Sequence, residues 1–195
     1  MRRKYYRFFG GLLHAQEAWL NQMAKRGYRL IRTEKLLYEF EECSPDHATY
    51  CVEFIAHRSK DEAEDYRDFL EDMGYRVFFK NSNLSCSVGK LRLRPWAKKG
   101  GRIATGVSTY DRELLIIEKE NDGKPFELHT ACKDKRMYYT YLRNPWLMLV
   151  LLFVVFTAVC RSAVFGVSAL ICLIPVLVYQ MQIEKNRCES KIKEW

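Results

Sequence analysis

The chain has 195 residues, of which 48% are hydrophobic and 29% charged, and its formal net charge is +8. The seven cysteines are scattered without a CxxC pair, which argues against a disulfide framework or a zinc site. The basic balance favours attraction to anionic lipid, with nucleic acid as the second explanation.

The first eighty residues alternate between strand and helix patterns. Apolar residues at 3–4 spacing predict the first helix with Trp19 as its core anchor, and Gly27 falls where a left-handed C-cap belongs. The predicted elements are a strand at 4–9, a helix at 12–24, strands at 28–31 and 36–40 (readable as one strand interrupted near residue 33), a strand at 49–55, a helix at 59–73 and a strand at 75–79.

Two halves of this region repeat weakly at an offset of 47 residues. The Gly-Tyr-Arg of residues 27–29 aligns with that of residues 74–76, and Trp19 aligns with Tyr66. Two β-α-β halves in tandem predict a ferredoxin-like β-α-β-β-α-β sandwich of the α+β class. Both helices would then cover one face of an antiparallel sheet.

The middle of the chain predicts extra β-hairpin strands and a basic patch. Residues 83–94 alternate enough to extend the sheet, and 112–118 and 125–129 read as further strands. The basic stretch 90–102 could contact anionic lipid, bind a protein partner or the acidic helix 61–72 of a second copy, contact nucleic acid, or be a solvated loop. Nucleic acid is the weakest of these alternatives, because Trp96 is the one well-placed aromatic residue. The candidate residues of this patch are Lys90, Arg92, Arg94, Trp96, Lys98, Lys99 and Arg102.

Residues 145–181 form two apolar runs that carry a single charge, Arg161. They predict a transmembrane hairpin of two helices that starts at Asn144-Pro145 and turns at Arg161-Ser162. A basic, tyrosine-rich interfacial helix at 132–144 would precede it. The alternative is a helical hairpin buried in a soluble core, for which the rest of the chain offers little cover.

Basic residues flank both ends of this hairpin, whereas its turn holds only Arg161. The positive-inside rule therefore predicts a two-pass protein of the cell membrane with cytoplasmic N- and C-termini. No cleavable signal peptide is expected, because the basic N-terminus lacks an apolar core. The candidate membrane-interface residues are Arg136, Tyr139, Arg143, Trp146, Arg161, Tyr179, Lys185 and Arg187.

The predicted domain organisation follows from these patterns. It comprises a ferredoxin-like domain at 1–94, a basic loop and β-hairpin extension at 95–131, the juxtamembrane helix at 132–144, the transmembrane hairpin at 145–181 and a basic cytoplasmic tail at 182–195.

No constellation of catalytic, cofactor-binding or metal-binding residues emerges. The four histidines lack metal-ligand spacing, and Ser87–Lys90 matches the S-x-x-K of serine acyl enzymes without its companion motifs. We therefore expect a protein that is not an enzyme and uses no cofactor.

Two sequence blocks resemble an uncharacterised bacterial family, domain-of-unknown-function family 2812. They are Trp19-Leu20-Asn21-Gln22-Met23-Ala24-Lys25-Arg26-Gly27-Tyr28 and Phe69-Leu70-Glu71-Asp72-Met73-Gly74-Tyr75. The resemblance covers about residues 5–80 and 126–142, with tyrosine at 28 and 75 where the family usually has tryptophan. It implies membrane helices after the domain and a regulatory setting beside PadR-type regulators, and it implies no catalytic residue.

The leading hypothesis is a membrane-anchored cytoplasmic sensor or protein-interaction module of regulatory function, held at the anionic inner leaflet and able to bind a protein partner or form a homodimer. The second is an accessory subunit of a transporter or other membrane complex, with small residues such as Gly166 and Ala169 as its packing surface. The third is an enzyme acting on lipid or peptide.

Overall fold

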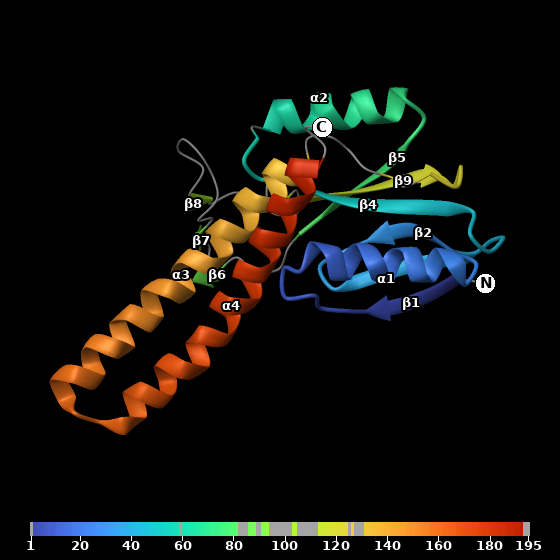
Figure 1. Ribbon diagram of the computed structural model, residues 1–195. Helices are drawn as coiled ribbons and strands as arrows, with labels where there is room; N and C mark the ends of the chain where they lie inside the picture. The colour runs from blue at the N-terminus through green and yellow to red at the C-terminus, as the bar shows by residue number, and fades with distance from the viewer. Residues whose placement is uncertain are drawn as a thin grey trace. The chain divides into compact units, whose positions relative to one another are not determined.

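The computed structural model describes residues 2–58, 60–81, 86–88, 91–93, 103–104, 113–124, 126 and 131–192. The chain divides into two compact units, Met1–Leu128 and His129–Trp195. The first, here the αβ unit, contains helices and small antiparallel sheets, and the second, the hairpin unit, is a pair of apolar helices (Figure 1). The predicted α+β class with a C-terminal helical hairpin is confirmed at this level.

The first half of the αβ unit is a β-α-β-β segment. It contains strands β1 (Arg2–Tyr6), β2 (Tyr28–Thr33) and β3 (Leu37–Glu42), with helix α1 (Leu13–Lys25) between the first two strands. β3 lies between β1 and β2 and is antiparallel to both, so β1 and β2 run parallel to each other. This arrangement is a split β-α-β motif.

The second half of the αβ unit has the same connectivity. It contains β4 (Ala48–Phe54), α2 (Lys60–Asp72), β5 (Arg76–Lys80) and β9 (Leu114–Glu120). β9 lies between β4 and β5 and is antiparallel to both. α1 and α2 are offset by 47 residues at both their first and last residues, which is the offset of the predicted repeat.

The repeating unit is one strand longer than the sequence indicated. Residues 28–40 are not one interrupted strand, because β2 and β3 form an antiparallel hairpin whose turn is closed by the Glu34 amide donating to the Leu37 carbonyl at 3.0 Å. Two β-α-β-β halves therefore build two three-stranded sheets. The single sheet of a ferredoxin-like sandwich is not confirmed.

The predicted extension of this sheet by residues 83–94 is also wrong for the residues described. β6 (Cys86–Val88) and β7 (Leu91–Leu93) pair with each other, and β7 pairs with β8 (Ile103–Ala104). These short strands form a third sheet of their own. Of the partner strand predicted at 125–129, the structure describes Phe126, which lies outside any strand.

Each helix of the αβ unit covers its own core. Trp19 of α1 is 8% exposed and makes edge contacts with the rings of Tyr38 and Phe40 in β3, at centroid distances of 5.0 and 5.5 Å. Leu70 of α2 is fully buried against the sheet that contains Leu115, in a second apolar cluster. The apolar stripe of each helix thus faces a sheet, and Trp19 is a core residue as predicted.

One buried carboxylate joins the two halves. Glu118 of β9 is 3% exposed and accepts hydrogen bonds from Arg29 of β2 at 2.7 Å and from the Tyr50 hydroxyl of β4 at 2.9 Å. The repeat-equivalent Arg76 lies 3.4 Å from the same carboxylate. Burial and the Glu118 charge raise the pKa of Tyr50, so its hydroxyl remains a donor, and it also accepts the Leu30 amide at 2.9 Å.

The hairpin unit consists of α3 (Ala131–Cys160) and α4 (Ala163–Ile192), joined by Arg161 and Ser162. The predicted helix start at Asn144-Pro145 is wrong, because α3 continues through Pro145 without a break. Proline lacks the backbone N–H that would bond the Tyr141 carbonyl. The helix nevertheless continues, because the backbone hydrogen bonds of the turns on either side remain. The predicted tight turn is confirmed, and Arg161 adopts a left-handed φ of 48° there.

Gly27 follows α1 with a φ of 81°, as its predicted C-cap requires, and the repeat-equivalent Gly74 follows α2 with a φ of 86°. A Cβ on Gly27 would meet the Cys43 carbonyl oxygen at 2.8 Å, whereas a Cβ on Gly74 would meet nothing within 4 Å.

Gly74→Ala should therefore destabilise the αβ unit by the left-handed strain alone, about 1–2 kcal/mol. Gly27→Ala should cost clearly more. Pulsed thiol labelling of the buried Cys51, located by peptide mapping in the full chain, measures both.

Glu118→Gln should destabilise the αβ unit by about 2 kcal/mol, a roughly thirtyfold change in its opening equilibrium, because two arginines lose their shared charge partner. The figure is reduced from that of a fully buried pair, since the Arg29 and Arg76 side chains are 26% and 42% exposed. Glu120→Gln, on the exposed end of the same strand, is the matched control. Equal labelling rates at Cys51 in both variants would contradict this role of Glu118.

Candidate functional site

Helix α1 carries most of the first family-like block, Trp19–Tyr28, here called the signature block, and its polar side chains bond the outer edge of β4. The Asn21 amide donates to the Tyr50 carbonyl at 3.0 Å and its oxygen accepts the Tyr50 amide at 2.7 Å. One turn earlier, Glu17 accepts the Val52 amide at 3.1 Å. Two polar side chains at i and i+4 therefore satisfy the strand edge as a neighbouring strand would. The Trp-Leu-Asn order places Trp19 in one core and Asn21 against the other half.

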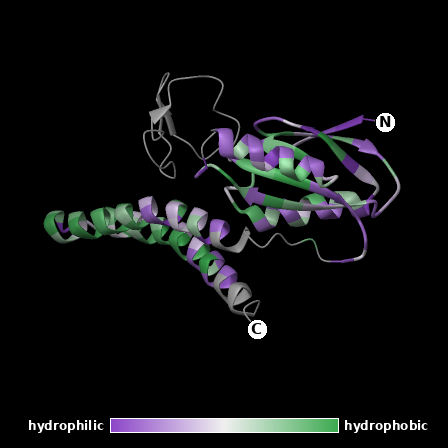
Figure 2. Cartoon of the chain, turned by 90° about the horizontal axis from the view of Figure 1, so that it is seen from above, coloured by the Kyte–Doolittle hydropathy of each residue, from purple (hydrophilic) through white to green (hydrophobic). Residues whose placement is uncertain are grey.

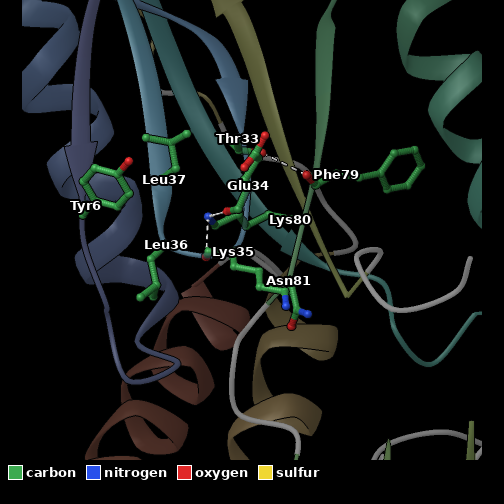
Figure 3. Close-up of a pocket in the computed structure, with 9 residues that line it drawn as sticks. All are labelled: Tyr6, Thr33, Glu34, Lys35, Leu36, Leu37, Phe79, Lys80 and Asn81. Atoms are coloured by element: carbon green, nitrogen blue, oxygen red, sulfur yellow. Dashed lines mark hydrogen bonds between the residues drawn. The ribbon is translucent and has the colours of Figure 1, made fainter. Parts of the chain in front are cut away.

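A hollow of about 460 Å³ opens where β1, the β2–β3 turn and β5 end (Figure 3). Lys80 lies at its wall with 3% exposure, and its ammonium donates to the Glu34 and Lys35 carbonyls, the latter at 2.8 Å. The ammonium also lies 4.1 Å from the centroid of the Tyr38 ring, and burial raises the pKa of Tyr38. The residues that line the hollow are Tyr6, Thr33, Glu34, Lys35, Leu36, Leu37, Phe79, Lys80 and Asn81.

The polar groups of this hollow hold the β2–β3 turn to β5. Besides the Lys80 contacts, the Thr33 hydroxyl donates to the Phe79 carbonyl at 3.0 Å (Figure 3). These bonds connect the two sheets of the αβ unit at the end opposite Glu118. In each of these bonds a side-chain ammonium or hydroxyl donates to a backbone carbonyl, which is a structural role.

Far from the turn, the two helices of the hairpin unit contact each other through polar and aromatic side chains. Near the turn they contact each other through stacked phenylalanine rings. Arg143 donates to Gln180 at 2.7 Å, and the Tyr139 and Tyr179 rings stack at 6.3 Å. Phe156 and Phe165 stack at 5.5 Å beside the turn.

In each helix of the hairpin, most apolar side chains point away from the other helix. Met148, Val159 and Val164 are 70–75% exposed. The segments Asp134–Cys160 and Ala163–Asn186 are long and apolar enough to cross a membrane. Figure 2 shows the hydrophobic colour concentrated along the half of the hairpin that holds the turn.

The predicted membrane-interface residues occupy different environments. Tyr139 and Tyr179 are buried, and Arg143 is half-buried beside Gln180. Arg136, Trp146, Arg161 and Lys185 are exposed, and Arg187 lies in α4 with its side chain outside the described part.

The predicted basic patch lies outside the described residues. This applies to Lys90, Arg94, Trp96, Lys98, Lys99 and Arg102, and also to the side chain of Arg92 in β7. Among the residues that the structure does describe, no group of three or more His, Cys, Asp or Glu side chains could hold a metal ion.

Sequence reasoning missed Lys80, Glu118 and Asn21. The repeated Gly-Tyr-Arg gave a usable signal, because Arg29 and Arg76 both reach Glu118. Glu118 itself lies 89 residues beyond Arg29 and had no local pattern to mark it. Asn21 belongs to the signature block, yet the sequence does not reveal that its partner is a strand edge.

Comparison with curated proteins and with solved structures finds no match. A family model does match residues 13–151, a span that includes α1, the strands from β2 to β9 and most of α3, and that leaves out β1. The match also covers residues 83–125, which lie outside the resemblance predicted from the sequence blocks. Because the match covers well over half of the chain, the protein belongs to the family DUF2812, described as a protein of unknown function.

Proposed function

We propose that the protein is a two-pass membrane protein that holds the αβ unit at the cytoplasmic face as a sensor or protein-interaction module. The observation that carries this proposal is the outward exposure of apolar side chains along α3 and α4, as at Val159 and Val164. In water such a surface would aggregate, whereas lipid tails cover it at no cost.

The orientation of the proposed insertion follows from charge. Arg161 is the one basic residue at the turn, and the other ends of both helices are rich in Lys and Arg, which favours a cytoplasmic location for them. These residues are Lys133, Lys135, Arg136 and Arg143 before the hairpin and Lys185, Arg187, Lys191 and Lys193 after it.

A binding role is supported by the way the αβ unit uses its buried polar groups. Glu118, Lys80 and Asn21 each bond groups of the protein itself and so hold the repeat together. We propose that the unit acts through its surface in a regulatory, non-enzymatic role. We also propose that each half is related to the ferredoxin-like fold, because each half contains the split β-α-β motif on which that fold is built.

The proposed topology predicts opposite labelling of two cysteines in intact cells. A membrane-impermeant maleimide should modify the introduced thiol of Ser162→Cys from outside, since the residue lies in the turn. Cys43 of the αβ unit, which is partly exposed, should react only after the cells are permeabilised. Peptide mapping by mass spectrometry reads both sites. Reaction of Cys43 in intact cells would contradict the orientation.

Purification in mild detergent followed by mass spectrometry tests the interaction role. A module that acts alone should elute as a monomer or homodimer, with regulatory partners in substoichiometric amounts. A membrane partner at one-to-one stoichiometry would instead identify the chain as an accessory subunit of a membrane complex. The Arg143→Ala variant, which loses the contact with Gln180 inside the hairpin, provides a control for detergent-induced separation of the helices.

A further inference from the structure

Three large apolar side chains gather at one end of the β1–β3 pair. Tyr6, Phe8 and Leu36 are 72%, 59% and 42% exposed, and they are here called the aromatic tip. Their proximity follows from the backbone, because Tyr6 pairs with Leu37 and the Arg7 amide donates to the Leu36 carbonyl at 2.9 Å. Single exposed apolar residues are ordinary, but a group of three, of which Tyr6 and Leu36 line the hollow, indicates a contact surface.

The charges around the aromatic tip are basic. Arg7 and Lys35 are both exposed, and the Arg7 guanidinium lies 5.1 Å from the Trp19 ring centroid. The nearby carboxylate of Glu34 is neutralised by Arg32 at 2.5 Å. Aromatic rings flanked by basic side chains are suited to the headgroup region of an anionic bilayer.

A second exposed apolar pair has the opposite surroundings. Phe69 of α2 and Met73, which directly follows this helix, are 55% and 47% exposed. Acidic residues of α2 surround them, including Asp65, Asp68 and Asp72. An anionic surface would repel this helix, so the two apolar patches of the αβ unit differ in the surface that they fit.

We propose that the aromatic tip docks on the anionic phospholipid surface of the same bilayer that holds the hairpin. This inference rests on the proposed membrane insertion of α3 and α4. Because the tether keeps the αβ unit near the bilayer, even a patch of three apolar residues and two cations is enough to hold it there. Docking then fixes which end of the αβ unit faces the lipid.

Photocrosslinking of the full chain in lipid nanodiscs tests the docking. A benzoylphenylalanine replaces either Phe8 or, as a matched control of similar exposure, Phe69. In discs that contain phosphatidylglycerol, position 8 should form lipid adducts and position 69 should stay at background, and adducts at position 8 should fall in phosphatidylcholine discs and in high salt. Intact-protein mass spectrometry measures the adduct yield.

Substitutions at the tip sharpen the test. Lys35→Gln should lower the adduct yield at position 8 by up to about fivefold, the contribution of one basic residue at an anionic surface. Leu36→Gln should lower it as well, and unchanged labelling of Cys51 verifies that the αβ unit remains folded.

Three results would overturn the docking proposal: equal lipid adducts at positions 8 and 69, adducts that ignore phosphatidylglycerol, or a cross-link from position 8 to a second copy of the chain. The hairpin is tested separately by retention of the protein in the discs after alkaline washing. Retention without adducts at position 8 refutes docking alone, whereas loss of the protein from the discs refutes the proposed insertion and the docking with it.

Discussion

The Glu118 carboxylate receives hydrogen bonds from both halves of the αβ unit, and the relative placement of the two sheets depends on it. Arg76 faces Glu118 across the β5–β9 pair, and Arg29 faces Glu41 at the equivalent position of the β2–β3 pair. Arg29 nevertheless bonds Glu118, in the other sheet. A buried ion pair adds little net stability, but it penalises any arrangement in which its charges are left unpaired. Glu118 therefore specifies how the repeats meet more than how strongly they hold.

Local features of the αβ unit were predictable because their causes are local. The stripe of α1, the left-handed Gly27 and the buried Trp19 each follow from side-chain periodicity or backbone sterics within a few residues. The bounds of β1 to β5 and of β9 lie within two or three residues of the predicted ones for the same reason. The apolar composition of residues 145–181 likewise sufficed to predict a helical hairpin, because hydrophobic length needs no tertiary context.

The errors arose where the decisive partner lies far away in sequence. Residues 28–40 have strand character throughout, and only pairing between Tyr28 and Glu42 shows that the chain reverses near Glu34. Pro145 resembles a helix start, yet the turns on both sides of it keep α3 continuous. Of the candidate site, the apolar hairpin was foreseen, whereas the aromatic tip depends on a backbone contact between Arg7 and Leu36 that no local pattern encodes.

The separation of β5 from β9 has a consequence for the order of folding. β1, α1, β2 and β3 are consecutive and can pair as soon as residue 42 is available, but β9 is the central strand of its sheet and follows β5 only after residues 81–113. Loop closure over that distance is slow, so the first half should form a nucleus on which the second assembles. In the folded chain Asn21 and Glu17, both supplied by the first half, occupy one edge of β4. The same side chains that complete the native strand edge would thus act as a built-in guard against premature strand pairing between nascent chains.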